Sequence, residues 1–385
     1  MFKDMKEFPK SKLKELAGTP MDELQIRFPD FRRDDLRFLR RKQIPKVASI
    51  PTPDAMLKYD IKERKMKGDK KGLDQKYKLL LAEYERVEKE NETLLSLKDY
   101  ATQTYTIKPY QGATSESTAV LLLSDTHIEE TVKKSTVNGL NEFNLDIAKE
   151  RIDNFFKAGL HLTQLEERNT PIKNVVLWLG GDFISGNIHE ELLETCSLRP
   201  VEAACRAMEH IESGIDFLLE NSDYKLVVVC SAGNHTRITK KVHIATEMGN
   251  SLELFLYTQL AKKYASNDRV EFVISDAYHT YVDVYGLTLR FHHGHAINYG
   301  GGVGGITIPV NKAIDAWNTN RRADMDVFGH FHQFFWGGRF VCNGSLIGYN
   351  PYAIRIKAKF ERPKQGMFII NQRLNEVIAV RPILV

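Results

Sequence analysis

Residues 119–127 read AVLLLSDTH, an apolar run that ends on an acid and a histidine. A short apolar run followed by polar residues is typical of a buried strand that leads into a loop. In an extended segment, residues two apart point to the same side, so Asp125 and His127 can reach one cation together. This stretch therefore predicts a strand that delivers two metal-binding side chains to its carboxyl end.

The same pattern continues along the chain. Strand-like runs at Asn174–Leu179 and Leu226–Cys230 alternate with helical stretches at Leu145–Leu165 and Val201–Leu219, which is a βαβαβ order. Further strand-like runs follow, with no long helix expected among them: Val270–Ile274, Tyr281–Val284, Leu287–Phe291, Met325–Phe328, Arg339–Cys342 and Met367–Ile370. The order predicts an α/β (α+β) fold in which two sheets pack together with helices outside.

Four more polar motifs follow strand-like runs in the manner of Asp125-Thr126-His127. They are Gly181-Asp182, Gly233-Asn234-His235, His293-Gly294-His295 and Gly329-His330-Phe331-His332. Each motif by itself is common in proteins. Together, and in this order, they supply carboxylate, imidazole and amide ligands for two divalent cations. The mixed oxygen and nitrogen donors, without thiolate, favour Mn²⁺, with Zn²⁺, Fe or Mg²⁺ as alternatives.

The order D-x-H, G-D, G-N-H, H and G-H-x-H resembles the calcineurin-like metallophosphoesterase superfamily over roughly residues 117–350. The resemblance implies a four-layer fold, a β-sandwich of two mixed sheets between helices. It also implies that Asp125, His127 and His332 bind one metal, that Asn234, His293 and His330 bind the other, and that Asp182 bridges the two. Asn343-Gly344-Ser345 is similar to the family's N-x-G-S turn with one residue missing.

His235 is left over once Asn234 serves as the ligand, so we expect His235 to protonate the leaving oxygen or to stabilise the transition state. The chain departs from the family pattern at two nearby positions. Ser185 stands where a second aspartate is common, and Thr236 stands where an acidic residue commonly follows G-N-H. Arg237 and His189 are candidate contacts for the substrate, the alternative being ordinary surface residues.

The front of the chain differs in composition from the rest. Residues 1–110 carry the excess of basic residues, whereas the remainder is slightly acidic. Residues 1–44 read as three short helices: Ser11–Ala17, one that opens at Thr19-Pro20, and an arginine-dense one after Pro29-Asp30. This basic module resembles a helix-turn-helix that binds DNA or RNA, and a helical cap that docks on protein is the alternative.

Residues 45–116 read as a proline-containing linker followed by an amphipathic helix, which leaves 117–385 for the catalytic domain. Apolar residues spaced by four and three over residues 73–94 form a short heptad seam with Asn91 on it. The seam predicts either a homodimeric coiled coil or a single helix lying on the catalytic domain.

These features together predict a two-metal phosphoester hydrolase, most specifically a phosphodiesterase or nuclease acting on DNA. The opening Ser124–Ile128 is similar to that of SbcD-type exonucleases, and the front module resembles attachments found in phage-encoded metallophosphoesterases. The alternative is a small-molecule phosphatase or a cyclic-nucleotide phosphodiesterase with the same metal site.

The expected compartment is the cytoplasm, or the host cytoplasm for a phage protein. No apolar stretch approaches the roughly 20 residues that span a bilayer, so no membrane partner is expected. The four cysteines show no CxxC spacing, which argues against a thiolate zinc site and fits a reducing compartment.

Overall fold

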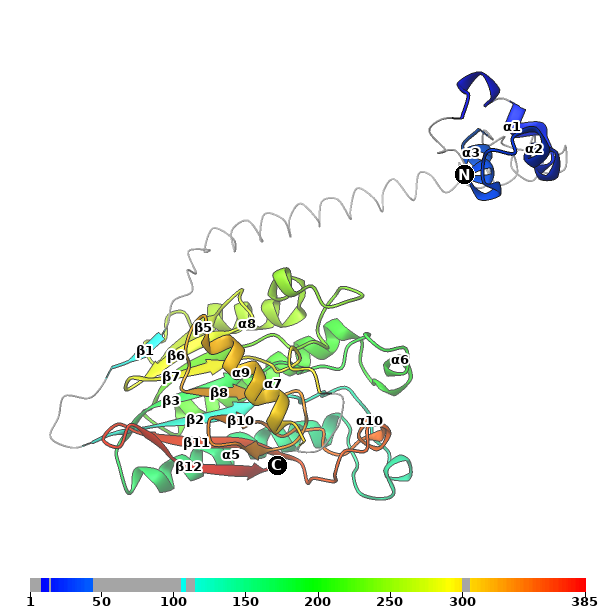
Figure 1. The fold of residues 1–385 in the computed structure, drawn as a ribbon. Helices are drawn as coiled ribbons and strands as arrows, with labels where there is room; N and C mark the ends of the chain where they lie inside the picture. Colours follow the sequence, from blue (N-terminus) through cyan, green and yellow to red (C-terminus); the bar gives the residue numbers. More distant parts are fainter. Residues whose placement is uncertain (1–7, 14, 44–104, 109–114, 300–304) are drawn as a thin grey trace, which may run out of the picture. The chain divides into compact units, whose positions relative to one another are not determined.

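The computed structural model describes residues 8–13, 15–43, 105–108, 115–299 and 305–385 (Figure 1). The chain divides into two compact units, Met1–Ser96 and Leu97–Val385. The expected linker and the heptad seam at 73–94 lie outside the described residues, so the dimer expectation stays a prediction. No described helix is long and apolar enough to cross a membrane.

One six-stranded sheet of the larger unit contains the strand predicted at Ala119–Leu123. Its order is β12-β11-β2-β3-β4-β5, with β2 to β5 parallel and β11 antiparallel to both β2 and β12. The strands are β2 (Ser117–Leu123), β3 (Ile172–Leu179), β4 (Lys225–Cys230), β5 (Val270–Ile274), β11 (Lys364–Asn371) and β12 (Glu376–Leu384). The sheet is therefore mixed.

The second six-stranded sheet has the order β1-β6-β7-β8-β10-β9. Parallel pairs join β1 to β6, β7 to β8 and β8 to β10, whereas β6–β7 and β9–β10 are antiparallel. The strands are β1 (Tyr105–Ile107), β6 (Thr280–Val284), β7 (Leu287–Phe291), β8 (Met325–Phe328), β9 (Phe335–Trp336) and β10 (Phe340–Cys342). This sheet is also mixed.

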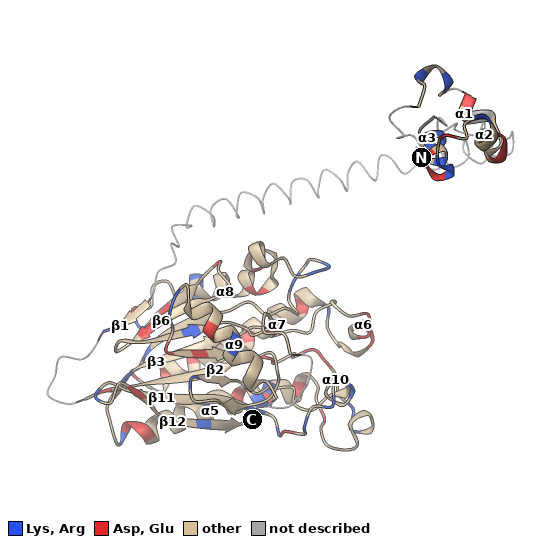
Figure 2. Ribbon diagram, in the orientation of Figure 1, with Lys and Arg blue, Asp and Glu red and all other residues tan. Residues whose placement is uncertain are grey.

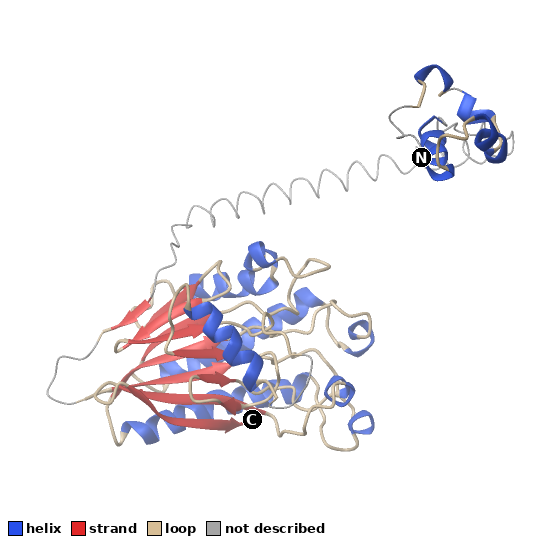
Figure 3. Cartoon of the chain, viewed as in Figure 1, coloured by secondary structure: helices blue, strands red, loops and turns tan. Residues whose placement is uncertain are grey.

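Helices flank both sheets (Figure 3). The longer ones are α5 (Leu145–Glu167), α7 (Pro200–Glu220), α8 (Leu252–Lys263) and α9 (Thr307–Asn318), and the short ones are α6 (Leu192–Thr195) and α10 (Pro351–Arg355). Asn144 begins α5 by accepting a hydrogen bond from the backbone N–H of Ile147 at 3.0 Å. Pro200 opens α7, where the backbone N–H that proline lacks would have no partner within the helix.

The layers follow from the alternation of side chains along the central strands. In β2, Ala119, Leu121 and Leu123 pack into the core that includes residues of α5 and α7. Val120 and Leu122 face the other way, into a core shared with β6, β7 and β8. A third cluster joins α9 to Phe328 and Phe340 on the outer side of the second sheet. The result is helices, sheet, sheet and helix, which confirms the expected two mixed sheets between helices.

Several elements differ from the sequence expectation. Helix α9 lies between β7 and β8, where no long helix was expected, and β1, β9 and β12 were not foreseen. The expected helix Ser11–Ala17 is instead a 3₁₀ turn at Lys10–Lys12 followed by α1 (Glu15–Gly18), because so short an apolar repeat does not sustain a longer helix.

Within its described residues, the smaller unit holds three α-helices: α1, α2 (Met21–Arg27) and α3 (Arg33–Gln43). Its core is a cluster of five buried side chains, Phe8, Leu16, Leu24, Phe31 and Leu36. Arginines and acidic residues both occur along its helices (Figure 2). Ion pairs that join them include Arg33–Asp22 and Arg37–Asp34. The basic charge of this unit is therefore partly neutralised.

Candidate metal centre

The five polar motifs begin within four residues of the ends of five strands. Asp125 follows β2, Asp182 follows β3 and Asn234 follows β4, and these three strands are parallel neighbours. His293 and His330 follow β7 and β8, which are parallel neighbours in the other sheet. Because the carboxyl ends of parallel strands share one edge of a sheet, each sheet brings its motifs to one place.

The first group of side chains consists of Asp125, His127 and His332. One ligand atom from each lies within 4.8 Å of the other two. The two Nε2 atoms of His127 and His332 are 3.3 Å apart, and His332 Nε2 is 3.4 Å from Asp125 Oδ1. Two imidazole nitrogens bound to one cation at about 2.1 Å stand about 3 Å apart at a right angle, so this spacing fits a shared metal.

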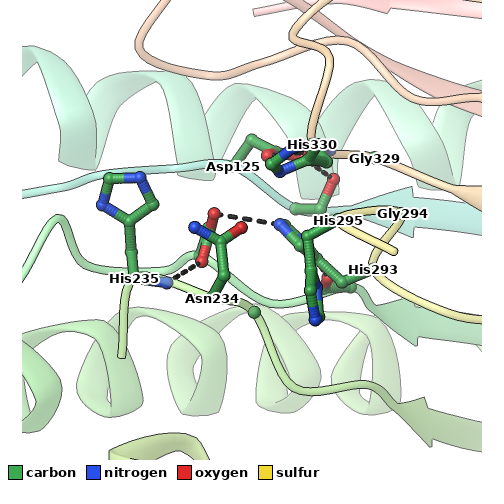
Figure 4. A network of polar contacts seen from close by, with 12 residues as sticks. Asp125, Asn234, His235, His293, Gly294, His295, Gly329 and His330 are labelled. Atoms are coloured by element: carbon green, nitrogen blue, oxygen red, sulfur yellow. Dashed lines mark hydrogen bonds and ion pairs between the residues drawn. The ribbon is translucent and has the colours of Figure 1, made fainter. Parts of the chain in front are cut away.

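The second group consists of Asp182, His293 and His330, again with ligand atoms within 4.8 Å of one another. The Asp182 carboxylate pairs with the His293 ring and accepts from the backbone N–H of His235. Figure 4 shows these two partners, His293 and His235, with Asn234. The Nδ1–H of His293 donates a hydrogen bond to the Gly180 carbonyl at 2.8 Å. This bond orients the ring so that Nε2 lies 2.9 Å from Asp182 Oδ2. Burial opposes charge on this ring, but the carboxylate outweighs it and raises the pKa of His293 to about 10.

Asn234 provides the test of whether a cation fits here. Its side-chain oxygen is buried and has no hydrogen-bond partner among the described residues. A buried amide oxygen without a donor is costly, and a cation is the partner that would remove the cost. Burial also lowers the pKa of His127 and of His330 well below the usual value, so both rings are neutral and keep a lone pair. The donor set therefore fits two divalent cations.

Backbone strain is concentrated in this centre. Asp125, His127, Asp182, His330 and His332 all have a positive φ, between 45° and 69°. For residues other than glycine, this left-handed conformation is uncommon and costs about 1 kcal/mol or more each. Asp125 and His127 therefore do not reach their group from an extended segment, as the sequence predicted, but from left-handed residues of one loop.

Two motif glycines are required by close approach. A Cβ on Gly233 would collide with the Asp182 carboxylate, and a Cβ on Gly329 would collide with Asp125 Oδ2 and Ser124 Oγ. The glycines of G-N-H and G-H-x-H therefore allow one loop to lie directly against the carboxylate carried by another.

A buried polar network orients Asp125. Its carboxylate accepts hydrogen bonds from Ser124 Oγ at 2.5 Å and from the His330 N–H at 3.0 Å. Ser124 Oγ in turn accepts from Asn343 Nδ2 at 2.9 Å, and Asn343 also donates to Gln365 Oε1 at 2.8 Å. The turn at Asn343, noted in the sequence only by resemblance, thus holds a predicted ligand through Ser124.

Two buried glutamates that the sequence analysis missed hold the loops together. Glu253, at the start of α8, accepts hydrogen bonds from the N–H groups of Phe183 at 3.1 Å and Gly233 at 2.7 Å. Glu129 accepts from the N–H groups of Ser185 at 2.8 Å and Gly186 at 2.9 Å. Burial raises the pKa of each glutamate to about 7. No spacing in the sequence links these residues, because their partners are backbone groups of other loops.

His235 lies beside the first group. Its ring is 4.8 Å from that of His127, and Nδ1–H donates to the Ser185 carbonyl at 2.9 Å, which leaves Nε2 available. The His189 ring lies 6.0 Å from the His235 ring. The Arg237 guanidinium donates a hydrogen bond to the Asn234 backbone carbonyl. Both candidate substrate contacts therefore border the centre, although Arg237 is also committed to its own loop.

No family model matches the chain, and no curated protein matches it. Solved structures that resemble it include a conserved predicted phosphoesterase from Streptococcus pneumoniae TIGR4, at 11% identity and TM-score 0.28, which covers 69% of this chain and 97% of that one. Wild-type Vps29 complexed with Zn²⁺ from Entamoeba histolytica has 13% identity and a TM-score of 0.26, and the match covers 69% of this chain and 96% of that one. A novel phosphatase from Mycoplasma pneumoniae has 12% identity and a TM-score of 0.25, and the match covers 70% of this chain and 92% of that one.

Proposed function

We propose that this protein is a two-metal phosphoester hydrolase of the calcineurin-like metallophosphoesterase type, and that it acts as a phosphodiesterase or nuclease on DNA. The observation that carries the hydrolase proposal is the pairing of two three-residue ligand groups, with the unpartnered Asn234 oxygen beside them. Asp125, His127 and His332 would hold one cation, and Asn234, His293 and His330 the other, with Asp182 shared. Mn²⁺ is the proposed metal.

Two bound cations would supply Lewis-acid stabilisation of the phosphoryl oxygens and lower the pKa of a water held between them. The protein's own part is to place the groups around them. The backbone N–H of His235 donates to the Asp182 carboxylate at 2.8 Å, and the Ser185 carbonyl orients the His235 ring. Because Nδ1–H donates to the Ser185 carbonyl, the doubly protonated ring of His235 would give its Nε2 proton to the departing oxygen and be left as neutral imidazole.

The DNA substrate is supported by the front unit. Arg37 and Arg41 are both exposed on α3. Leu36 of the same helix packs into the core of the unit. A basic helix face attached to a phosphodiesterase centre would hold the backbone of a polyanion.

The hydrolase proposal is tested with Mn²⁺-loaded protein on bis-p-nitrophenyl phosphate. Wild type should hydrolyse it, Asp182→Asn should be inactive, and His235→Ala should lose about a hundredfold or more in kcat. His161→Ala is the matched control, since His161 is exposed on α5. A His235→Ala variant as active as wild type would remove His235 from the chemistry.

The DNA proposal is tested separately on linear single- and double-stranded DNA. Cleavage should fall with salt, and a double variant Arg37→Glu/Arg41→Glu should weaken DNA binding and flatten the salt dependence. Arg206→Glu on α7 is the control, because Arg206 is also exposed and also pairs with a nearby acid, Glu209. Hydrolysis of cyclic nucleotides with DNA left intact would favour the small-molecule alternative.

A further inference from the structure

Ser185 makes contacts in three directions from a fully buried position. Its Oγ lies 2.9 Å from His127 Nδ1, its carbonyl lies 2.9 Å from His235 Nδ1, and its N–H donates to Glu129 Oε1 at 2.8 Å. One residue thus contacts a proposed metal ligand through its side chain and the proposed proton donor through its backbone.

Glu130 settles the direction of the hydrogen bond to His127. The Ser185 hydroxyl donates to Glu130 Oε2 at 3.1 Å, so the Ser185 oxygen is left to accept from His127 Nδ1–H. Glu130 Oε1 accepts from Asn350 Nδ2 at 3.2 Å, and Asn350 is itself fixed as the N-cap of α10. The chain of donors therefore runs from His127 through Ser185 to Glu130.

We propose that Ser185 and Glu130 are positioning residues that fix the ring of His127 with its Nε2 lone pair aimed at the metal. The inference rests on the proposed function, since it assigns a task toward the bound cation. A hydrogen bond from the far nitrogen of a metal-bound histidine sets both the tautomer and the orientation of the ring, and its loss typically weakens metal binding 10- to 100-fold. In this chain a serine and a glutamate from two loops together perform that task.

The two roles of Ser185 can be separated. Ser185→Ala removes the hydroxyl that contacts His127 and Glu130, but it keeps the carbonyl that contacts His235 and the N–H that contacts Glu129. The variant should therefore disturb the His127 side of the centre while His235 remains in place.

Calorimetric titration of metal-free protein with Mn²⁺ tests the inference without any substrate. Wild type should bind two Mn²⁺ ions, and Ser185→Ala and Glu130→Ala should each bind one of them about 10- to 100-fold more weakly. Glu130→Gln should bind that ion more tightly than Glu130→Ala, because its amide oxygen still accepts from Ser185. Ser222→Ala, which removes a hydroxyl bonded to the Leu218 carbonyl on α7, should match wild type.

A double-mutant cycle and a spectroscopic readout separate this role from a merely structural one. Ser185→Ala/Glu130→Ala should bind Mn²⁺ no worse than the weaker single variant, because both changes break the same chain. In metal-free protein with labelled histidine rings, NMR should show a proton on His127 Nδ1 in wild type and a loss of that preference in Ser185→Ala.

The outcomes are distinct. Two Mn²⁺ ions bound with unchanged affinity in Ser185→Ala and Glu130→Ala would overturn the inference and leave the proposed hydrolase intact. A wild type that binds no Mn²⁺ would overturn both.

Discussion

Replacing Glu253 with glutamine should change how stability depends on pH. Glu253 is 1% exposed, and its two oxygens accept from Phe183 N–H, Gly233 N–H and, at 3.0 Å, Thr236 Oγ. Burial, reinforced by the charge of Asp182, raises the pKa of Glu253 to about 7 from its usual 4.5. The gap of about 2.5 pKa units corresponds to about 3 kcal/mol.

The sign follows from proton linkage. A carboxyl with a raised pKa binds its proton more tightly in the folded state than in the unfolded state. Glu253 therefore contributes stability that is fully present below about pH 4.5 and is lost as the pH rises to about 7. The amide of Glu253→Gln resembles the protonated acid at every pH. Between about pH 5 and pH 8 the free energy of unfolding of the variant should therefore gain up to about 3 kcal/mol on that of wild type.

Urea unfolding of metal-free protein, followed by circular dichroism, measures this difference across the pH range. Taking the difference between variant and wild type cancels the titration of the groups that do not interact with Glu253. Glu209→Gln, at an exposed position on α7, is the matched control. A Glu253→Gln difference that stayed constant, or that moved in favour of wild type as the pH rose, would show that the three hydrogen bonds outweigh the burial of the charge.

Three further changes test the centre. Gly233→Ala should lose about 1–3 kcal/mol in urea unfolding and lose calorimetric Mn²⁺ binding, because the added Cβ meets the Asp182 carboxylate, whereas Gly249→Ala has open space and should do neither. Asn343→Ala should cost about 1–3 kcal/mol in the same unfolding assay, since it leaves buried polar partners unpaired; a cost near zero would count against the network on Asp125. Because the pKa of His293 is about 10 without metal, Mn²⁺ binding near pH 8 should release a proton, and binding should strengthen as the pH rises. Calorimetry in buffers of different ionisation enthalpy measures the released proton. The His293→Ala variant should release fewer protons when it binds Mn²⁺.

The strand-end motifs could be predicted because they depend on local order alone. A strand, a turn and a polar residue are adjacent in sequence, and parallel pairing then brings Asp125, Asp182 and Asn234 to one edge. Glu129 and Glu253 could not be predicted, because what defines their role is burial against N–H groups of distant loops. Such partners have no side-chain signal in the sequence.

Two elements that the sequence did not predict, α9 and β12, each contain a proline. Helix α9 contains Pro309, which reads as a helix breaker, yet it occupies the first turn, where the backbone N–H has no partner in the helix. Strand β12 contains Pro382, and β12 is tolerated as a strand because it lies at the edge of its sheet. In both cases the position of the proline within the element, which only the structure supplies, decides the outcome.

The left-handed backbone at five proposed ligand positions has a consequence for engineering. Glycine adopts that conformation without strain, so truncating the partly exposed His332 to glycine would relieve backbone strain and delete a ligand in one step. Selection of a variant library for thermal stability alone would therefore favour glycine at such positions, and the most stable variants would bind a cation least well.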